Sequence, residues 1–433
     1  MSRALLIQLA RLGDLVQSLP VLTSLHSVYP EQTVDLLCPS PLVSLGELFP
    51  CVDRVYPWKG GEWHELASTK LANCEQRLER AKRYLSECAF PTYSLAYNLN
   101  NHPRGMLAAH ILSDLVVGPG EYGPLNPTLP SWAGYLRQIA QDRGKNRVHL
   151  ADAFCGLCQV LPPSHIPCLR TTGVQLPLGL ERIVNDPSSM LVGIVLGTGD
   201  ADRRIPLSVW QDLIVACTEW IPQCYLFMIG GEGEREAALA LEHNLPAKYM
   251  NRVVNGCGRT SLPQLVGILN RCKWVVGSDT GPLHLGAICG ARVIGWYFSR
   301  ARVHETGPYG IGHYVWQYKS GQPRESRNDH RARIARSFSN HWPVMETVNL
   351  LREEQVDSIK AEWDLWTSHH DEWGAFYTQN GKADEAVHQR KEIWKALTPV
   401  TAEYSDGSLQ LIENAPSRVQ SRNTLRGYSL RDN

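Results

Sequence analysis

The sequence predicts an α/β protein with two doubly wound, mainly parallel sheets. Three observations indicate this fold class. Short apolar runs alternate with helical patterns along the chain, which is typical of parallel sheets covered by helices on both faces. The 433 residues exceed one ordinary core and suit two domains of roughly 150 to 200 residues each, with additional chain left over. A stretch rich in proline and glycine at residues 162–187 separates the two series of apolar runs.

The first domain is expected to span residues 1–175. Its strands are predicted at residues 4–9, 33–38, 53–56 and 93–98, and its helices near residues 15–28 and 66–87. The second domain is expected to span residues 188–335. Its strands are predicted at residues 191–196, 224–229, 252–254, 274–276 and 293–296. Five strands with intervening helices form a doubly wound sheet.

Beyond the second sheet, residues 340–397 are predicted to form a helical extension that carries Trp363, Trp366, Trp373 and Trp394. Tryptophans at this spacing indicate a helix packed on its own domain or, if exposed, a surface for a membrane or partner. The polar tail at residues 398–433 is expected to be disordered. The basic stretch at residues 324–336 suits an anionic lipid or a solvated loop.

Composition limits the classes of partner. The 43 basic and 43 acidic residues give no net charge, so no global field favours nucleic acid or an anionic membrane. No run approaches the roughly twenty apolar residues of a membrane span. Twelve cysteines without the spacing of a small disulfide scaffold indicate a reducing compartment. We therefore expect a cytoplasmic protein without nucleic-acid partners, whose membrane contact, if any, is local and peripheral.

The most informative segment is residues 275–285, where an apolar run stops at a polar turn and restarts as a helix with Pro282 in its first turn. The start of a helix has unsatisfied N–H donors and a partial positive charge, and Gly281 allows close approach to the backbone. These features predict a binding site for a diphosphate. Asp279 suits a hydrogen-bond acceptor for sugar hydroxyls or a helix cap, and His284 could face the same pocket. The alternative is a capped helix that simply follows a strand.

Two motifs resemble one known family. The string Asp-Thr-Gly-Pro-Leu-His at residues 279–284 resembles the donor-site signature of glycosyltransferase family 9, the heptosyltransferase-like enzymes. The opening strand, Gly-Asp turn and first helix at residues 4–20 resemble the start of the same family. The resemblance implies a GT-B architecture, in which two Rossmann-like domains face each other across a cleft. It also implies inverting transfer from a nucleoside-diphosphate sugar such as ADP-heptose, without a metal or other cofactor.

The same resemblance assigns roles to individual residues. Asp14 corresponds to the proposed general base, although it also suits an N-cap. The residues implied to bind the donor are Thr198, Arg203, Glu234, Asp279, Thr280, Gly281 and His284. Arg203 stands where relatives often have lysine, and its fork of donors also suits phosphate. The alternatives are a solvated Arg203 and, for the acidic residues at positions 232, 234 and 236, stabilisation of a helix start. Residues 255–265 resemble the family's base-binding segment, although Thr260 or Ser261 is equally explained as a cap.

The acceptor is less defined. Candidate acceptor ligands are Arg11, Asn101 and Arg104, and the acceptor is expected to be a glycan, a lipopolysaccharide-type glycolipid or a protein. Gln8 occupies a place where many relatives carry a basic residue, which argues against an ordinary phosphorylated lipid-core acceptor. A different class of function also stays open, namely a non-catalytic member of this fold that binds a nucleotide sugar or a partner protein.

Three further patterns suggest other chemistry. Asp200 and Asp202 match a metal-binding Asp-x-Asp pattern but lie in a glycine loop. The glycines near residues 197 and 230 complete no dinucleotide fingerprint, which argues against an oxidoreductase. Four residues have ligand types that suit a structural zinc, but their spacing is not a standard one, and buried cysteines are common. They are Cys155, Cys158, His165 and Cys168.

Overall fold

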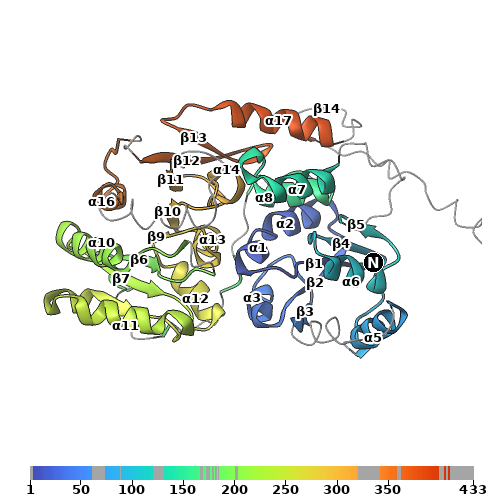
Figure 1. Ribbon diagram of the computed structural model, residues 1–433, viewed down its shortest axis with the longest axis horizontal. Coiled ribbons are helices and arrows are strands. Elements are labelled where there is room, and N and C mark those ends of the chain that lie inside the picture. The colour runs from blue at the N-terminus through green and yellow to red at the C-terminus, as the bar shows by residue number, and fades with distance from the viewer. Residues whose placement is uncertain are drawn as a thin grey trace, which may run out of the picture.

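The computed structural model describes residues 3–60, 74–87, 89–119, 131–165, 169–171, 176–177, 180, 183, 185–199, 203–319, 342–357, 362–398, 404–405 and 408–409. Two α/β domains lie side by side, and the C-terminal part of the chain runs across both of them (Figure 1). The expected α/β class with two sheet domains is confirmed.

The N-terminal domain contains a five-stranded parallel sheet in the order β3-β2-β1-β4-β5. Its strands are β1 (Arg3–Ile7), β2 (Thr33–Pro39), β3 (Val55–Trp58), β4 (Leu95–Asn98) and β5 (Val116–Val117). Successive side chains of a strand point to opposite faces. Leu6 therefore packs into one hydrophobic cluster, while Leu5 and Ile7 pack into another. Burial on both faces explains why β1 is apolar from Ala4 to Ile7.

The helices of this domain cover both faces of the sheet. They are α1 (Leu12–Val16), α2 (Leu19–Val28), α3 (Val43–Gly46), α5 (Cys74–Glu87), α6 (Pro103–Leu112), α7 (Trp132–Gln141) and α8 (Leu150–Leu157), with short 3-10 turns at η1 (Ser40–Leu42) and η2 (Arg143–Lys145). Helix α2 packs on α8, and α7 packs on α8 as well. This places α7 and α8 on the side of the domain nearest the C-terminal part of the chain (Figure 1).

The second sheet has eight strands in the order β13-β12-β11-β10-β9-β6-β7-β8. The six strands from β11 to β8 are parallel, and β12 and β13 are antiparallel additions at one edge. The strands are β6 (Met190–Val195), β7 (Cys224–Ile229), β8 (Val253–Asn255), β9 (Trp274–Gly277), β10 (Arg292–Tyr297), β11 (Tyr314–Tyr318), β12 (Trp363–Asp371) and β13 (Gly374–Gln379). Each of the nine strands expected from the sequence is present, whereas β5, β11, β12 and β13 were not predicted.

Helices again cover both faces of the second sheet. They are α10 (Leu207–Trp220), α11 (Arg235–Asn244), α12 (Leu262–Leu269), α13 (Gly281–Ile288), α14 (Val303–Thr306), α16 (Val344–Leu351) and α17 (Glu385–Leu397), with 3-10 turns at η4 (Glu232–Glu234) and η5 (Ala247–Arg252). Their apolar residues and the strands enclose a core that includes four stacked or tilted tryptophans, namely Trp210, Trp296, Trp342 and Trp363.

The expected helical extension is only partly helical. The segment contains α16 and α17, but residues 363–379 form the antiparallel strands β12 and β13. Trp363 and Leu365 are buried and alternate with less buried neighbours, which is a two-residue period rather than a helical one. Trp363 and Trp394 are each 1% exposed and pack within the protein, whereas Trp366 and Trp373 are half-buried.

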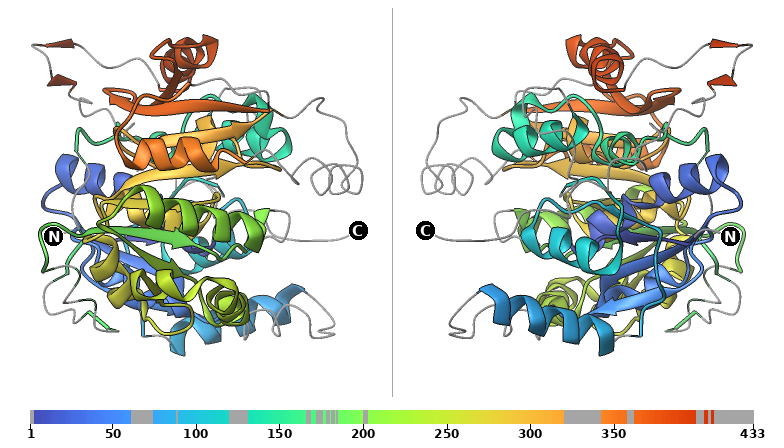
Figure 2. Two further views of the ribbon diagram at one scale, coloured as in Figure 1. Left: turned by 90° about the vertical axis from the view of Figure 1, so that its left-hand side faces the viewer. Right: turned by 90° about the vertical axis from the view of Figure 1, so that its right-hand side faces the viewer.

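We call β12, β13 and α17 the C-terminal strap, because together they connect the two domains. The strap lies across both domains in Figure 1, and both side views in Figure 2 show α17 above the β12–β13 pair. Its backbone donates from Ala375 N to Asp152 Oδ2 of α8 at 2.8 Å. The ring of Trp394 lies 4.5 Å from that of Trp132 on α7. The strap thus fixes the N-terminal domain against the second sheet.

Some expectations concern residues outside the described part of the chain. These are the first part of the predicted helix at residues 66–87, the basic stretch at residues 324–336 and most of the tail. In the tail, the short strands β14 (Tyr404–Ser405) and β15 (Ser408–Leu409) pair with each other. Among the described helices, none combines the length and apolar character needed to cross a membrane.

Candidate active site

The site lies where the first turn of the N-terminal domain meets the carboxyl ends of the central strands of the second sheet. Helix α1 packs against α13, and two glycines allow this contact. A Cβ atom on Gly281 would lie 2.6 Å from Cγ of Leu12, and one on Gly13 would lie 3.2 Å from Cδ2 of His284. Any side chain at position 281 would push the domains apart. The Gly13-Asp14 turn is therefore pressed against the start of α13.

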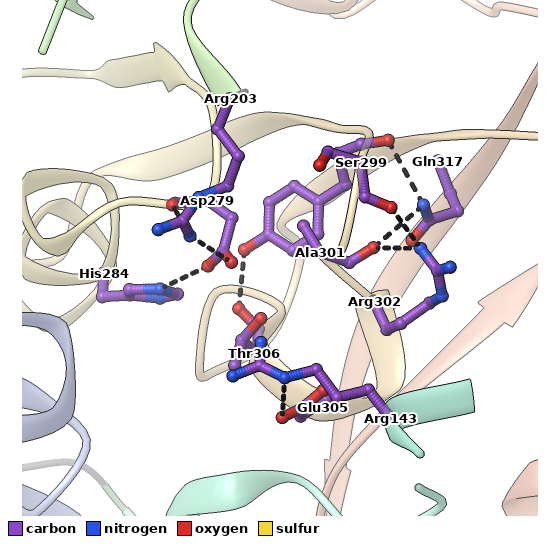
Figure 3. A network of polar contacts seen from close by, with 11 residues as sticks. Arg143, Arg203, Asp279, His284, Ser299, Ala301, Arg302, Glu305, Thr306 and Gln317 are labelled. Carbon is purple, nitrogen blue, oxygen red and sulfur yellow. Dashed lines mark hydrogen bonds and ion pairs between the residues drawn. The ribbon is translucent and has the colours of Figure 1, made fainter. Parts of the chain in front are cut away.

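Asp279 connects two basic side chains at the end of β9. Nη1 of Arg203 donates to Asp279 Oδ2 at 2.9 Å and to the Asp279 carbonyl oxygen at 2.6 Å, and Nε2 of His284 lies 3.0 Å from Asp279 Oδ1 (Figure 3). Burial alone would raise the pKa of Asp279. The hydrogen bond from His284 and the charges of His284 and Arg203 outweigh burial, so the pKa of this carboxyl lies below its ordinary value. Asp279 therefore stays ionised and holds both basic groups in place.

Two polar atoms at the start of α13 have no hydrogen-bond partner among the described residues. Thr280 is the N-cap of α13 in an extended conformation, but its hydroxyl makes no capping bond, and its Oγ1 is buried without a partner. Nδ1 of His284 is likewise buried without a partner. Buried polar atoms in proteins normally find partners, so unpaired ones indicate a place where a ligand can bind. Both atoms flank a helix start, which favours an anion.

Asp14 is the third residue of α1 and lies half-buried at the domain boundary. Its Oδ2 accepts a hydrogen bond from the backbone N–H of Arg11 at 3.2 Å. The expected N-cap role of Asp14 is wrong, because Arg11 is the N-cap residue and Asp14, as the third residue of the helix, bonds back to it. Burial raises the pKa of Asp14, while the Arg11 N–H bond and the charge of His284 oppose that rise. A carboxyl with a raised pKa beside a histidine is suited to accept a proton. The sequence thus identified three acidic or basic groups, Asp14, Asp279 and His284, that the fold brings together.

Glu234 extends from η4 over the end of β6. Its Oε2 accepts from the Gly231 N–H at 2.9 Å, and a Cβ atom on Gly197 would lie 2.9 Å from its Cδ. The carboxylate therefore lies against the loop that contains Gly197 and Thr198. Its exposed neighbour Glu232 pairs with Arg235 at 3.0 Å, which fits the interpretation that it needs no ligand.

The loop before α12 behaves as a cap. Ser261 Oγ accepts from the Gln264 N–H at 3.4 Å, and Gln264 Oε1 accepts from the Ser261 N–H at 2.9 Å. This reciprocal pair is a capping box, and it accounts for Ser261 without a ligand.

The acceptor candidates are divided between structural and exposed positions. Arg104 donates to Nδ1 of His102 at 3.3 Å at the start of α6, and Asn101 next to it is exposed. Asn100 is buried and holds the loop after β1, because its Oδ1 accepts from Leu9 N at 2.9 Å. Arg11 is exposed and lies away from Asn101 and Arg104, beside the loop after β6. A Cβ atom on Gly199 of that loop would lie 3.4 Å from its Nη1.

One ion pair of the site crosses the domain boundary, and the sequence did not reveal it. Arg143 of η2 contacts Glu305 of α14, with Nε 3.5 Å from Oε1 (Figure 3). Glu305 is 4% exposed, and burial raises its pKa to about 7 even though Arg143 opposes the rise. Arg302 donates to the carbonyl oxygens of Ser299 and Ala301. These residues belong to no local motif, so only the tertiary structure could identify them.

The four residues with zinc-ligand chemistry were not expected to form a metal site, and the described ones lie in different surroundings. Cys155 and Cys158 lie in the hydrophobic core on and just after α8, and burial raises the pKa of both thiols. A raised pKa disfavours the thiolate form that binds zinc. Within the described residues, no group of three or more potential ligands could hold a metal ion. Cys168, Asp200 and Asp202 lie outside the described part of the chain.

The chain and its fold are similar to those of known glycosyltransferases. The model of glycosyltransferase family 9 (heptosyltransferase) matches residues 180–331. A family 9 glycosyltransferase from Veillonella parvula has a similar structure, with a TM-score of 0.59 and 17% identity over 81% of this chain and 96% of that one. The ADP-heptose LPS heptosyltransferase II of E. coli has a TM-score of 0.52 and 17% identity, over 82% of this chain and 100% of that one. The E. coli heptosyltransferase WaaC with ADP has a TM-score of 0.52 and 17% identity, over 71% of this chain and 91% of that one. No curated protein matches the sequence significantly.

Proposed function

We propose that this chain, a glycosyltransferase of family 9, transfers a heptose or similar sugar from a nucleoside-diphosphate donor to an acceptor hydroxyl with inversion of the anomeric configuration. ADP-heptose is the leading candidate donor, because ADP and ADP-heptose appear in the names of two similar structures. The observation that carries the proposal is the meeting of Asp14 with Asp279, His284 and the start of α13 across the domain boundary.

The donor diphosphate would bind at the start of α13. The partial positive charge of the helix start and the Arg203 guanidinium oppose the charge of the phosphates. Asp279 carries a negative charge there, but its two oxygens already accept from Arg203 and His284, so it fixes these groups rather than repelling the donor. The unpaired Thr280 Oγ1 and His284 Nδ1 are then available to hydrogen-bond the donor. Glu234, on the loop after β7, would accept hydrogen bonds from the ribose of the nucleoside.

Asp14 would serve as the general base. Its carboxylate takes the proton of the acceptor hydroxyl while that oxygen forms a bond to the anomeric carbon. The bond from the anomeric carbon to the diphosphate breaks at the same time, and its electron pair leaves with the diphosphate. Arg203 and the helix start stabilise the charge that develops on the leaving group, so the proposed reaction is metal-independent.

The acceptor would be a hydroxyl of a glycan, a lipopolysaccharide-type glycolipid or a protein, and would approach from the N-terminal domain, where Asn101 and Arg104 are candidate ligands. We place the reaction in the cytoplasm. With a lipid-linked acceptor, the enzyme would work at the inner face of the membrane through peripheral contact.

The first experiment is a thermal-shift screen against ADP-, GDP-, UDP- and dTDP-sugars, with and without EDTA. Selective stabilisation by one nucleotide that EDTA does not change is expected, because a bound ligand stabilises the folded state. Stabilisation without sugar transfer to any acceptor would favour a non-catalytic nucleotide-sugar-binding protein.

The second experiment tests the base. Asp14→Asn keeps an oxygen for the Arg11 N–H but cannot take a proton at neutral pH. Turnover should fall by roughly 10²- to 10⁴-fold, with donor affinity retained. Glu236→Gln, which changes an exposed carboxyl in the first turn of α11, is the matched control and should keep full turnover. Full turnover of the Asp14 variant would contradict the mechanism.

A further inference from the structure

Arg11 belongs to the N-terminal domain but extends to the donor side of the site. It is the N-cap residue of α1, on the turn between β1 and Asp14. A Cβ atom on Gly199 would lie 3.4 Å from Nη1 of Arg11 and 3.9 Å from its Cζ. The guanidinium therefore lies against the Gly197-Thr198-Gly199 loop of the second domain, which follows β6.

The other arginines around the site already have protein partners. Arg203 donates twice through Nη1 to Asp279, and Arg143 pairs with Glu305. Arg302 is bound to the backbone of its own loop. Among the described residues Arg11 is exposed, and its guanidinium lies beside Gly199.

The negative charge near the start of α13 would be stabilised by a further positive group. Asp14 and Asp279 both place carboxyl groups near the start of α13, and Arg203 is largely neutralised by Asp279. A departing diphosphate adds further negative charge at the same place. Charge-assisted bonds from a guanidinium to phosphate are strong and can be bidentate, so a second arginine would stabilise that charge.

We propose that Arg11 is a donor ligand supplied by the N-terminal domain, and that its guanidinium binds the diphosphate of the nucleotide sugar across the domain boundary. The inference rests on the proposed function and moves Arg11 from the acceptor side to the donor side. The diphosphate would then be held by Arg203 and α13 from one domain and by Arg11 from the other. Arg11 and the base Asp14 are on one short turn, so docking of that turn would supply both groups together.

The test compares ligands with and without phosphates. Isothermal titration of ADP, GDP and UDP, and of adenosine, guanosine and uridine, is performed on the wild type and on Arg11→Ala, Arg11→Lys and Arg204→Ala. Arg11→Ala should weaken binding of the preferred diphosphate by roughly 10- to 100-fold without changing affinity for the matching nucleoside. Arg11→Lys should recover part of the affinity. Arg204 is exposed next to Arg203, and its variant should bind as the wild type does.

The outcomes separate the inference from the proposed function. Unchanged diphosphate affinity in Arg11→Ala, or equal weakening of diphosphate and nucleoside, would overturn the role of Arg11. A raised KM for the acceptor with unchanged diphosphate affinity would also overturn it and return Arg11 to the acceptor side. If the wild type binds none of the three diphosphates, the proposed donor site itself fails. Because Arg11 is exposed, its variants should unfold at the wild-type temperature.

Discussion

We expect the protein to lose stability as the pH rises, because the carboxyl of Asp152 is buried. The side chain is fully buried on α8, and burial raises its pKa to about 7 from an ordinary value of 3.8, although hydrogen bonds from Tyr309 and Ala375 oppose that rise. Because the folded state binds the proton more tightly than the unfolded state, the stabilisation is complete below the unfolded pKa. It is lost as the pH rises through about 7. The free energy of unfolding should fall by about 4 kcal/mol over this range, since each pH unit contributes about 1.4 kcal/mol.

The substitution Asp152→Asn tests this reasoning, because an amide cannot ionise but can keep the hydrogen bonds. Its oxygen can accept from Ala375 N–H, as Asp152 Oδ2 does at 2.8 Å. Its NH₂ group can donate to the Tyr309 hydroxyl, which can donate in turn to Nε2 of His370 at 3.2 Å. The variant should therefore gain about 3 kcal/mol relative to the wild type between pH 5 and pH 8.

The assay is guanidinium unfolding of both proteins at four pH values from 5 to 8. Glu305→Gln is measured in parallel, because Glu305 also has a pKa of about 7 and the same sign of pH dependence. Each variant should remove its own part of the pH dependence. A stability difference between Asp152→Asn and the wild type that is constant from pH 5 to pH 8 would refute the argument.

Two further predictions concern packing. Trp394→Ala should lower the free energy of unfolding by about 3 to 5 kcal/mol in denaturant titrations, since this side chain is 1% exposed and packs edge-on against Trp132. A loss below about 1 kcal/mol would mean that the strap does not anchor the domains. Gly307→Ala should lower the melting temperature, because a Cβ atom there would overlap the hydroxyl of Tyr377. Gly233→Ala, where a Cβ atom would meet open space, is the control, and equal melting temperatures for the two variants would contradict the prediction.

The strands that the sequence predicted are those whose burial on both faces makes them continuously apolar, such as β6 and β7. The two-residue strand β5 is too short to give a pattern. Strand β12 carries Ser368, His369 and His370 in its second half, so apolar periodicity could not identify it. Its tryptophans were therefore assigned to a helix.

In the site, too, the residues within a local sequence pattern could be predicted and those without one could not. Asp14 and Asp279 stand in local motifs where a strand ends and a helix begins, so their places could be predicted. The contact between Arg143 and Glu305 joins elements of different domains, and neither residue has a local pattern that indicates the other. The position of Arg11 against Gly199 likewise depends on how the domains dock.

The hairpin of the C-terminal strap also limits how the protein can be divided. The portion that matches the family model ends at residue 331, after β11 and before β12. If this portion were cut out, β11 would have a row of unpaired backbone donors and acceptors along its whole length, which is a template for aggregation. In the intact chain β12 covers this edge with an antiparallel ladder, so the added hairpin protects β11 from pairing with another molecule.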